Sequence, residues 1–225
     1  MNSKTFTLCA VLLGSTVLTG CVSKITTEEQ FSGYLNGYHG LEKTKSATGE
    51  PVLRWVVSGF NPDDYSTIVF DELELFPAPK PTERVNLETL EDLRAITNAN
   101  LVHVLEQKYK VIPGSKAVSG APRTLVLHAA ITGVSASPQG LHWYEILPVG
   151  AVVGAVAAVT GKRDQDTELF IEADLVDAST GYPVAKVVRK VIGSELENNK
   201  QKITTKDFKL ALKGLTSDLS QFINQ

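Results

Sequence analysis

Cysteine is scarce in this chain, and its two positions are unusual. Both cysteines, Cys9 and Cys21, lie within the first 21 of the 225 residues. The 204 residues that follow Cys21 (225 − 21) contain no thiol. This absence excludes disulfide bonds, cysteine ligands for zinc and a thiol nucleophile from that part of the chain. Its fold must therefore be held together by its core alone.

Several functional patterns are missing as well. No apolar run of about 18 residues follows Cys21, so no later transmembrane helix is predicted. The net charge is −3 without a basic cluster, which argues against a nucleic-acid partner. No GxSxG, HExxH, P-loop or Rossmann glycine motif occurs. The histidines show neither HxH nor HxxxH spacing; they are His39, His103, His128 and His142. We therefore predict a non-enzymatic protein without a cofactor or a metal site.

The first residues have the layout of a secretory signal. Lys4 is the one charged residue before Cys21, and the stretch 6–18 is mostly apolar. This stretch ends in LTGC at 18–21, which resembles the lipobox of bacterial lipoproteins. The resemblance implies cleavage of residues 1–20 as a lipoprotein signal peptide. It also implies a diacylglycerol on the Cys21 thiol and acylation of the new amino group, for example with palmitate. The alternative is an ordinary secretory signal that happens to contain cysteine.

The anchor also predicts a location. Three acyl chains on one residue hold a protein firmly, whereas a single chain holds it only marginally. Val22 and Ser23 follow the cysteine, whereas lipoproteins retained in the inner membrane commonly have aspartate directly after it. The resemblance therefore implies a lipid anchor on Cys21 in the outer membrane, at its periplasmic face.

Residues 21–50 are predicted to be a lipidated tether, because they are rich in threonine, serine, glycine, lysine and glutamate. One piece departs from this composition. Phe31, Tyr34, Leu35 and Tyr38 recur at the spacing of one helical face. They predict a short amphipathic helix that packs on the domain. The alternative is an aromatic face that lies in the membrane interface.

Residues 51–225 are predicted to form one periplasmic α+β domain, an antiparallel-rich sheet with helices packed on one face. β-Branched and aromatic residues predict strands over 52–58, 67–76 and 123–134. Asn86 is a good N-cap for a helix over about 87–108.

The clearest local pattern is a hairpin over 167–192. A three-residue loop, Ser179-Thr180-Gly181, places Asp174 opposite Lys186 on one face and apolar side chains on the other. The chain then ends in a helix. Thr204 and Asp207 have the spacing of a capping box. An apolar stripe from Phe208 to Ile223 requires a packing partner.

Four short motifs resemble one family. They are FSGYL at 31–35, GFNPDDY at 59–65, LPVGA at 147–151 and ADLVDASTG at 173–181. In this order they are similar to a family of uncharacterised Gram-negative bacterial lipoproteins filed as domain of unknown function 3313. The resemblance implies the lipoprotein class and the cell-envelope location. It supplies no activity and no catalytic residue.

The segment 146–159, ILPVGAVVGAVAAV, has no charged residue and contains a GxxxG pattern of Gly150 and Gly154. Small residues at this spacing allow close approach of backbones, and the segment is too short to span a bilayer. The favoured interpretation is a core element. The alternative is an association surface or a membrane contact.

A second candidate is the loop LHWYE. It contains His142, Trp143, Tyr144 and Glu145. Aromatic rings stack on ligands such as sugars, and carboxylates accept hydrogen bonds, so these side chains are candidate ligand or partner contacts. A third pattern is the acidic strand with Asp71, Glu72 and Glu74, which is relevant because paired carboxylates hydrolyse glycosidic bonds. Charges on one strand more commonly form a solvated face.

These patterns predict a membrane-anchored envelope lipoprotein that acts as a non-enzymatic structural or protein-interaction module. Its partners would be the membrane, through Cys21, and an envelope protein or a second copy of the chain. The first alternative is a periplasmic ligand-binding lipoprotein that uses the loop 142–145. A weaker alternative is an envelope glycan hydrolase.

Overall fold

The computed structural model describes residues 24–114, 120–137, 165–198 and 200–225. The hairpin at its centre consists of β7 (Gln165–Asp177) and β8 (Pro183–Leu196). The two strands pair antiparallel with Asp174 opposite Lys186, as predicted. Gly181 in the connecting turn has φ 74°, a conformation that side chains with a Cβ rarely adopt. The hairpin is longer than the 167–192 predicted from sequence.

The other strands extend this hairpin into a mixed, mostly antiparallel sheet. Its order is β1-β2-β8-β7-β6-β3-β5, and β4 pairs with β6. The further strands are β1 (Glu42–Lys45), β2 (Pro51–Val56), β3 (Thr67–Val69), β4 (Glu74–Leu75), β5 (Lys110–Ile112) and β6 (Thr124–Ser137). The parallel pairs are short: β3 pairs with β5 and with β6, and β4 pairs with β6. The predicted α+β class with an antiparallel-rich sheet is confirmed.

The strand predicted over 67–76 is wrong as one element, because it is divided into β3 and β4. Phe70 and Leu73 are both buried, at 4% and 1% exposure. Two residues three apart cannot share one face of a regular strand, since side chains alternate between faces. The Leu73 N–H instead donates to the side-chain oxygen of Asn98, 2.8 Å away. The backbone therefore departs from regular strand geometry between β3 and β4, and the side chains of Phe70 and Leu73 are both buried.

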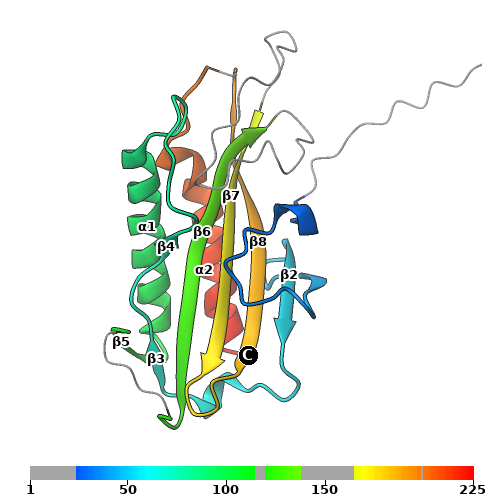
Figure 1. Ribbon diagram of the computed structural model, residues 1–225, viewed down its shortest axis with the longest axis vertical. Helices are drawn as coiled ribbons and strands as arrows, with labels where there is room; N and C mark the ends of the chain where they lie inside the picture. The colour runs from blue at the N-terminus through cyan, green and yellow to red at the C-terminus, as the bar shows by residue number, and fades with distance from the viewer. Residues whose placement is uncertain (1–23, 115–119, 138–164, 199) are drawn as a thin grey trace, which may run out of the picture.

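Two helices, α1 (Leu87–Leu105) and α2 (Lys209–Ile223), cover one face of the sheet (Figure 1). Asn86 caps α1 by accepting the Thr89 N–H at 2.7 Å, which confirms the predicted N-cap. The capping box is also present, and Asp207 accepts the Thr204 N–H at 2.7 Å. It opens a 3₁₀ turn, Thr205–Phe208, that continues into α2. The apolar stripe of α2 packs into the main core between helices and sheet.

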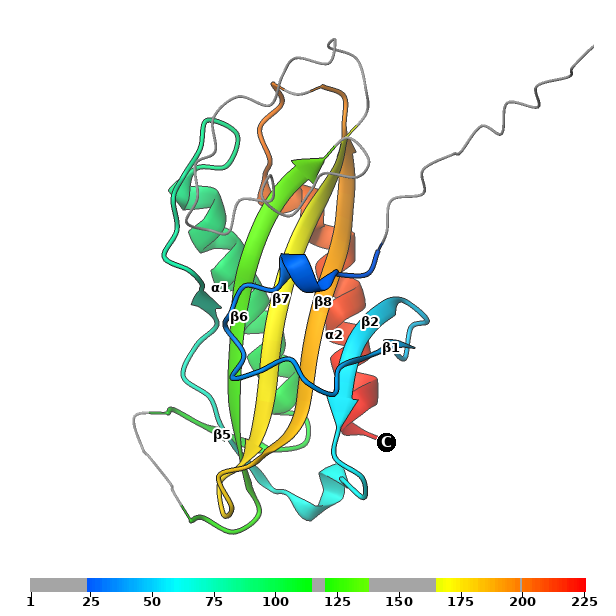
Figure 2. The same ribbon diagram turned by 45° about the vertical axis from the view of Figure 1, so that its right-hand side comes forward.

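Residues 24–41 form a segment that we call the strap. It crosses the sheet face opposite the helices (Figure 2). The helix predicted over 31–38 is wrong, since a single 3₁₀ turn occurs at Glu28–Gln30. Gly33 and Gly37 have φ values of 85° and 87°, which interrupt any helix between them. The aromatic residues nevertheless pack on the sheet, as expected, around a second small core of Leu35, Leu53 and Val188.

The strap continues directly into the sheet. β1 pairs antiparallel with β2, so part of the predicted tether is an edge strand. Lys24 forms an ion pair of 3.2 Å with Glu50, at the other end of that tether. Residues 24–50 thus belong to the folded unit.

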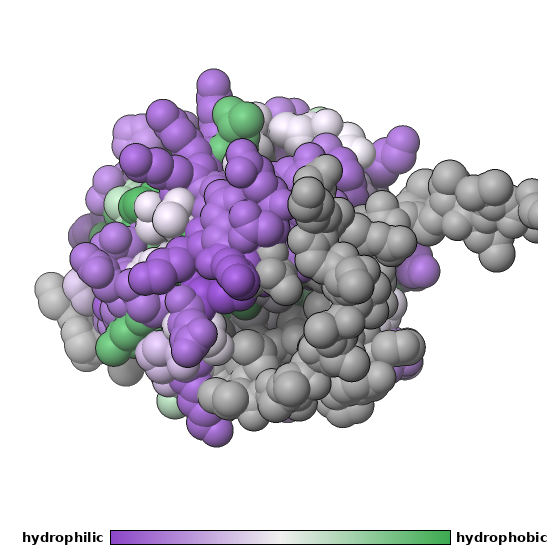
Figure 3. Space-filling view, turned by 90° about the horizontal axis from the view of Figure 1, so that it is seen from above, coloured by the Kyte–Doolittle hydropathy of each residue, from purple (hydrophilic) through white to green (hydrophobic). Residues whose placement is uncertain are grey.

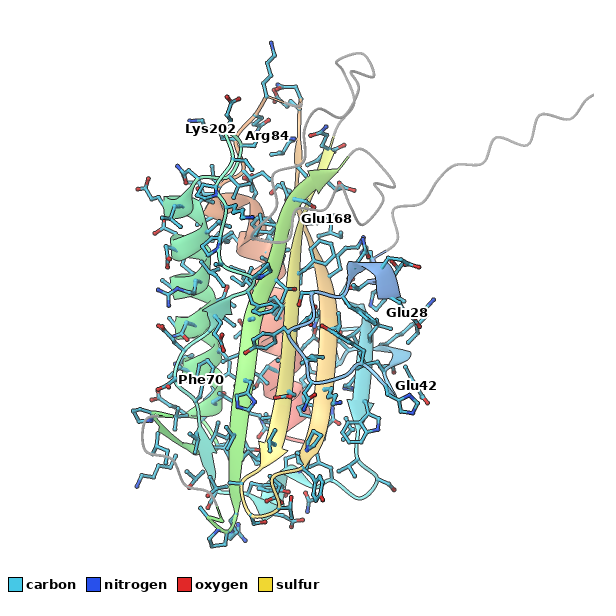
Figure 4. The ribbon with its side chains drawn as sticks, in the orientation of Figure 1. Glu28, Glu42, Phe70, Arg84, Glu168 and Lys202 are labelled. Atoms are coloured by element: carbon cyan, nitrogen blue, oxygen red, sulfur yellow. The ribbon has the colours of Figure 1, made fainter. Side chains whose placement is uncertain are left out.

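Figure 3 shows the end of the molecule that is uppermost in Figure 1. Seen from above, its coloured residues are mostly hydrophilic, and the hydrophobic ones lie in a few separate spots (Figure 3). Arg84 and Lys202 are labelled at this end in Figure 4. The connection after β8 is fastened here, because the Ile203 N–H donates to the Arg84 carbonyl at 2.9 Å. Within the described ranges, neither helix is long and apolar enough to cross a membrane.

Candidate functional site

The residues singled out from the sequence fall mostly outside the described ranges. These are Cys21, the loop residues His142, Trp143, Tyr144 and Glu145, and the glycines Gly150 and Gly154. The interpretations of these residues therefore stay predictions.

The acidic residues of the predicted strand 67–76 lie within the described ranges. Their three carboxylates contact different partners. Glu72 forms an ion pair of 2.7 Å with Arg94. Asp71 accepts the Gly114 N–H at 2.9 Å, and Glu74 accepts the Tyr34 hydroxyl at 2.9 Å. These contacts give each carboxylate a structural role, and they do not converge on a common space.

The most buried carboxylate is one that the sequence analysis missed. Glu172, on β7, is 1% exposed beneath the strap. It accepts the Ser32 backbone N–H at 2.9 Å and the Tyr38 hydroxyl at 2.5 Å. The Tyr38 oxygen in turn accepts the Gly33 N–H at 2.7 Å. A buried carboxylate requires such partners, so Glu172 fixes the strap to the centre of the sheet.

Aromatic stacking completes this cluster. The rings of Phe31 and Tyr38 are stacked with centroids 4.2 Å apart. Burial and the hydrogen bond to Glu172 raise the pKa of the Tyr38 hydroxyl to about 12. Burial and the Glu74 carboxylate likewise raise the pKa of Tyr34. Both tyrosines are therefore neutral hydrogen-bond donors over the ordinary pH range.

A histidine–aspartate pair lies on the same face of the sheet. His128, on β6, is directly opposite Asp174, and its Nδ1 is 2.8 Å from the carboxylate. The hydrogen bond to Asp174 raises the pKa of His128. Such a pair could orient an imidazole for proton transfer. In the part of the chain that the structure describes, no serine or threonine hydroxyl is hydrogen-bonded to His128, so the pair lacks an adjacent nucleophile. No group of three potential metal-ligating side chains occurs there either.

The opposite side of the molecule has a groove between the outer surfaces of α1 and α2. Its volume is about 700 Å³. Its charged or ionisable lining side chains are His103, Lys206, Lys209 and Lys213, and no acidic side chain lines it. Among the described residues, none of these lysines has a carboxylate within ion-pair distance. The groove is therefore cationic on a protein whose net charge is −3, and it suits an anionic partner.

Known proteins show the class to which this chain belongs. It is a member of the family described as "Protein of unknown function (DUF3313)", whose model matches residues 30–219. It is 37% identical over 222 residues to the uncharacterized lipoprotein YdcL of Escherichia coli K12. That alignment covers 99% of this chain and 98% of the relative. The chain therefore belongs to a family of uncharacterised Gram-negative lipoproteins, which implies attachment to a membrane.

Solved structures resemble this fold only distantly. A PelC dodecamer from Paraburkholderia phytofirmans has a TM-score of 0.38 and 14% identity, covering 75% of this chain and 94% of that one. Lipoprotein GNA1162 from Neisseria meningitidis has a TM-score of 0.34 and 18% identity, covering 72% and 99%. Scores this low support no inference about assembly or activity.

Proposed function

We propose that this lipoprotein is a non-enzymatic interaction module, held by lipid on Cys21 at the periplasmic face of the outer membrane. The groove between α1 and α2 binds an acidic segment of an envelope protein. The observation that carries this proposal is that the strap and the groove lie on opposite sides of the sheet. The strap, which begins three residues after Cys21, lies on one face of the sheet, and the helices that border the groove lie on the other (Figure 2).

The short connection to the anchor limits how far the domain can move from the bilayer. A fully extended chain spans about 3.3–3.6 Å per residue, so Cys21 lies at most about 11 Å from Lys24. Glu172 and the aromatic contacts fasten the strap that follows. The strap face is therefore nearer to the bilayer, and the α1/α2 groove is directed toward the periplasm.

Charge favours an acidic occupant for the groove. Lys206, Lys209 and Lys213 are exposed and line one groove. Clustered charges of one sign attract an oppositely charged segment and orient it during association. The outer-membrane assignment is supported by Val22 and Ser23, which follow the lipidated cysteine in place of aspartate.

A non-enzymatic role is supported by the contacts of the acidic and histidine side chains. Asp71, Glu72 and Glu74 have separate structural partners. Ligand binding through the loop 142–145 and glycan hydrolysis remain alternatives. A titration of glycan fragments that follows Trp143 fluorescence, with a Trp55→Phe background, separates ligand binding from the interaction role.

Site-specific photocrosslinking in cells tests the proposal. A photoreactive amino acid is placed at Ser217, which lines the groove, or at Glu42 on the distant edge strand β1. We expect one recurrent envelope protein to be captured from position 217 and not from position 42. Capture of a second copy of the chain from position 217 would instead identify the groove as a homo-oligomer contact.

A charge reversal then connects the capture to electrostatics. Replacement of Lys206, Lys209 and Lys213 by glutamate is expected to abolish capture of the partner protein from position 217. The matched control is the same reversal at three exposed lysines outside the groove, namely Lys43, Lys45 and Lys110. Capture that is equally weakened by both triple variants, or by neither, would refute a role for the groove.

A further inference from the structure

A cavity lies inside the domain, between the sheet and the helices. Its volume is about 200 Å³. Its wall is formed mainly by aliphatic side chains from α1, α2 and the central strands, including Leu101, Leu105, Leu127, Leu175, Leu215 and Leu219. It lies between the sheet and the helices, beside the α1/α2 groove, and Asn100, Leu212 and Thr216 line both spaces.

This volume is large for a protein interior. Cores are packed as densely as organic crystals, and voids larger than a water molecule are few. An engineered apolar cavity of about 150 Å³ remains dry and binds benzene. A cavity larger than that one, with a similar wall, is therefore suited to an apolar ligand.

Thr97 on α1 gives an independent indication of a ligand. Its side chain lines the cavity, and the residue is 7% exposed. Its hydroxyl oxygen is buried without a hydrogen-bond partner among the described residues. Buried polar atoms are nearly always paired, so a hydroxyl left unpaired at a cavity wall indicates a partner that the chain itself does not supply.

One cation that lines the cavity has no ion-pair partner among the described residues. Arg54, on β2, lines the cavity, and its guanidinium lies 5.7 Å from the ring centroid of Phe222 on α2. No described carboxylate forms an ion pair with Arg54, whereas neighbouring Arg189 is paired with Asp218. Arginine binds carboxylates and phosphates through two parallel hydrogen bonds. Arg54 is thus available for an anionic group at the edge of an apolar space.

We propose that this cavity binds one single-chain anionic amphiphile. Its hydrocarbon chain fills the space between helices and sheet, and Arg54 binds its carboxylate or phosphate. Fatty acids and lysophospholipids share this chemistry. The site is distinct from the proposed partner groove, because Arg54 and Thr97 line the cavity alone and the three groove lysines do not line it.

Native mass spectrometry of the mature lipidated protein, released from octyl glucoside micelles, tests the proposal. The probes are dodecanoate, dodecyl phosphate, a lauroyl lysophosphatidylglycerol and dodecyltrimethylammonium. We expect one bound equivalent of at least one anionic probe and at least tenfold weaker binding of the cationic one. Preference for dodecanoate indicates a fatty acid, and preference for the lysophospholipid indicates a membrane lipid. Absence of bound mass with all anionic probes would overturn the proposal.

Substitutions at the cavity wall and at Arg54 locate the bound molecule. Ala173→Leu adds three carbon atoms to the cavity wall, and we expect it to abolish binding. Arg54→Gln removes the cation and is expected to weaken binding of the anionic probes about tenfold or more. The control is Lys43→Gln, because Lys43 is an exposed cation on the neighbouring strand β1. If Ala173→Leu does not fold, Leu219→Trp narrows the cavity from α2.

The variants also separate a specific site from adsorption to the protein surface. Binding that persists unchanged in Arg54→Gln and in a folded occluding variant would refute the site. These outcomes do not depend on capture of a protein partner at Ser217, so this proposal and the proposed function fail separately.

Discussion

Removal of the Glu172 side chain should release the strap while the remainder of the sheet stays folded. Glu172 accepts hydrogen bonds from the Ser32 N–H and the Tyr38 hydroxyl. A hydrogen bond to a charged group contributes about 1.5–3 kcal/mol, and part of this gain is offset by the desolvation of the carboxylate. For Glu172→Ala we therefore expect the strap to lose about 2–4 kcal/mol of local stability. A whole domain has about 5–15 kcal/mol.

Hydrogen exchange measured by mass spectrometry checks this magnitude. A loss of about 2–4 kcal/mol raises the opening equilibrium about 30- to 900-fold, since about 1.4 kcal/mol is a factor of ten. We expect exchange of peptides covering 31–41 to accelerate by this factor, because local opening sets their protection. Peptides covering α1 should change much less.

Fluorescence gives a second measurement of the same opening. The strap backbone at Gly40 lies against the Trp55 ring, since a Cβ at position 40 would be 2.9 Å from it. In a Trp143→Phe background, Glu172→Ala should alter Trp55 emission at denaturant concentrations below the global transition. Glu42→Ala is the control, because Glu42 is exposed on β1. Unchanged protection of the strap, or an equal loss of protection throughout the sheet, would contradict the assigned role of Glu172.

Three further measurements test individual contacts. Thr97→Val replaces an unpaired buried hydroxyl by an apolar group of similar shape, so the ligand-free protein should gain about 1–3 kcal/mol in urea denaturation; a loss would show that the hydroxyl has a partner. Asn86→Ala removes the cap of α1 and should cost about 1 kcal/mol by the same assay, whereas Asn86→Asp should cost little. The pKa of Tyr38 and of Tyr65 is raised to about 12, mainly by burial, from an ordinary value of 10.0. The folded protein therefore holds these protons at pH values where the unfolded chain releases them, and stability should fall as pH rises from about 10 to 12. Equal urea midpoints at about pH 9 and pH 11.5 would contradict this assignment.

Local sequence patterns predicted the central elements correctly. The apolar residues at every second position of β7, from Leu169 to Leu175, together with Gly181 in the turn, indicated the register that places Asp174 opposite Lys186. The caps at Asn86 and Thr204 are equally local, because each requires only side chains within three residues. These features depend on short-range geometry that the order of residues specifies directly.

Contacts between distant segments were not predictable in the same way. The helical spacing of Phe31, Tyr34 and Tyr38 correctly indicated a packed segment but gave the wrong backbone, because Gly33 and Gly37 adopt left-handed conformations. Glu172 alternates with apolar residues in β7 and so has the pattern of a solvent-facing residue. A pairing of its carboxylate with Ser32, 140 positions earlier in the chain, has no local signature.

The sequence by itself determined the lipoprotein class, the α+β architecture, the central hairpin, the cap of α1 and the capping box of the 3₁₀ turn before α2. The tertiary structure alone decided the path of the strap, the division of β3 from β4, the cationic groove and the cavity beside Arg54. The physical reason is the range of the interactions involved. Periodicity and turn chemistry act between neighbouring residues, whereas buried charges and cavities arise only where several distant elements pack together.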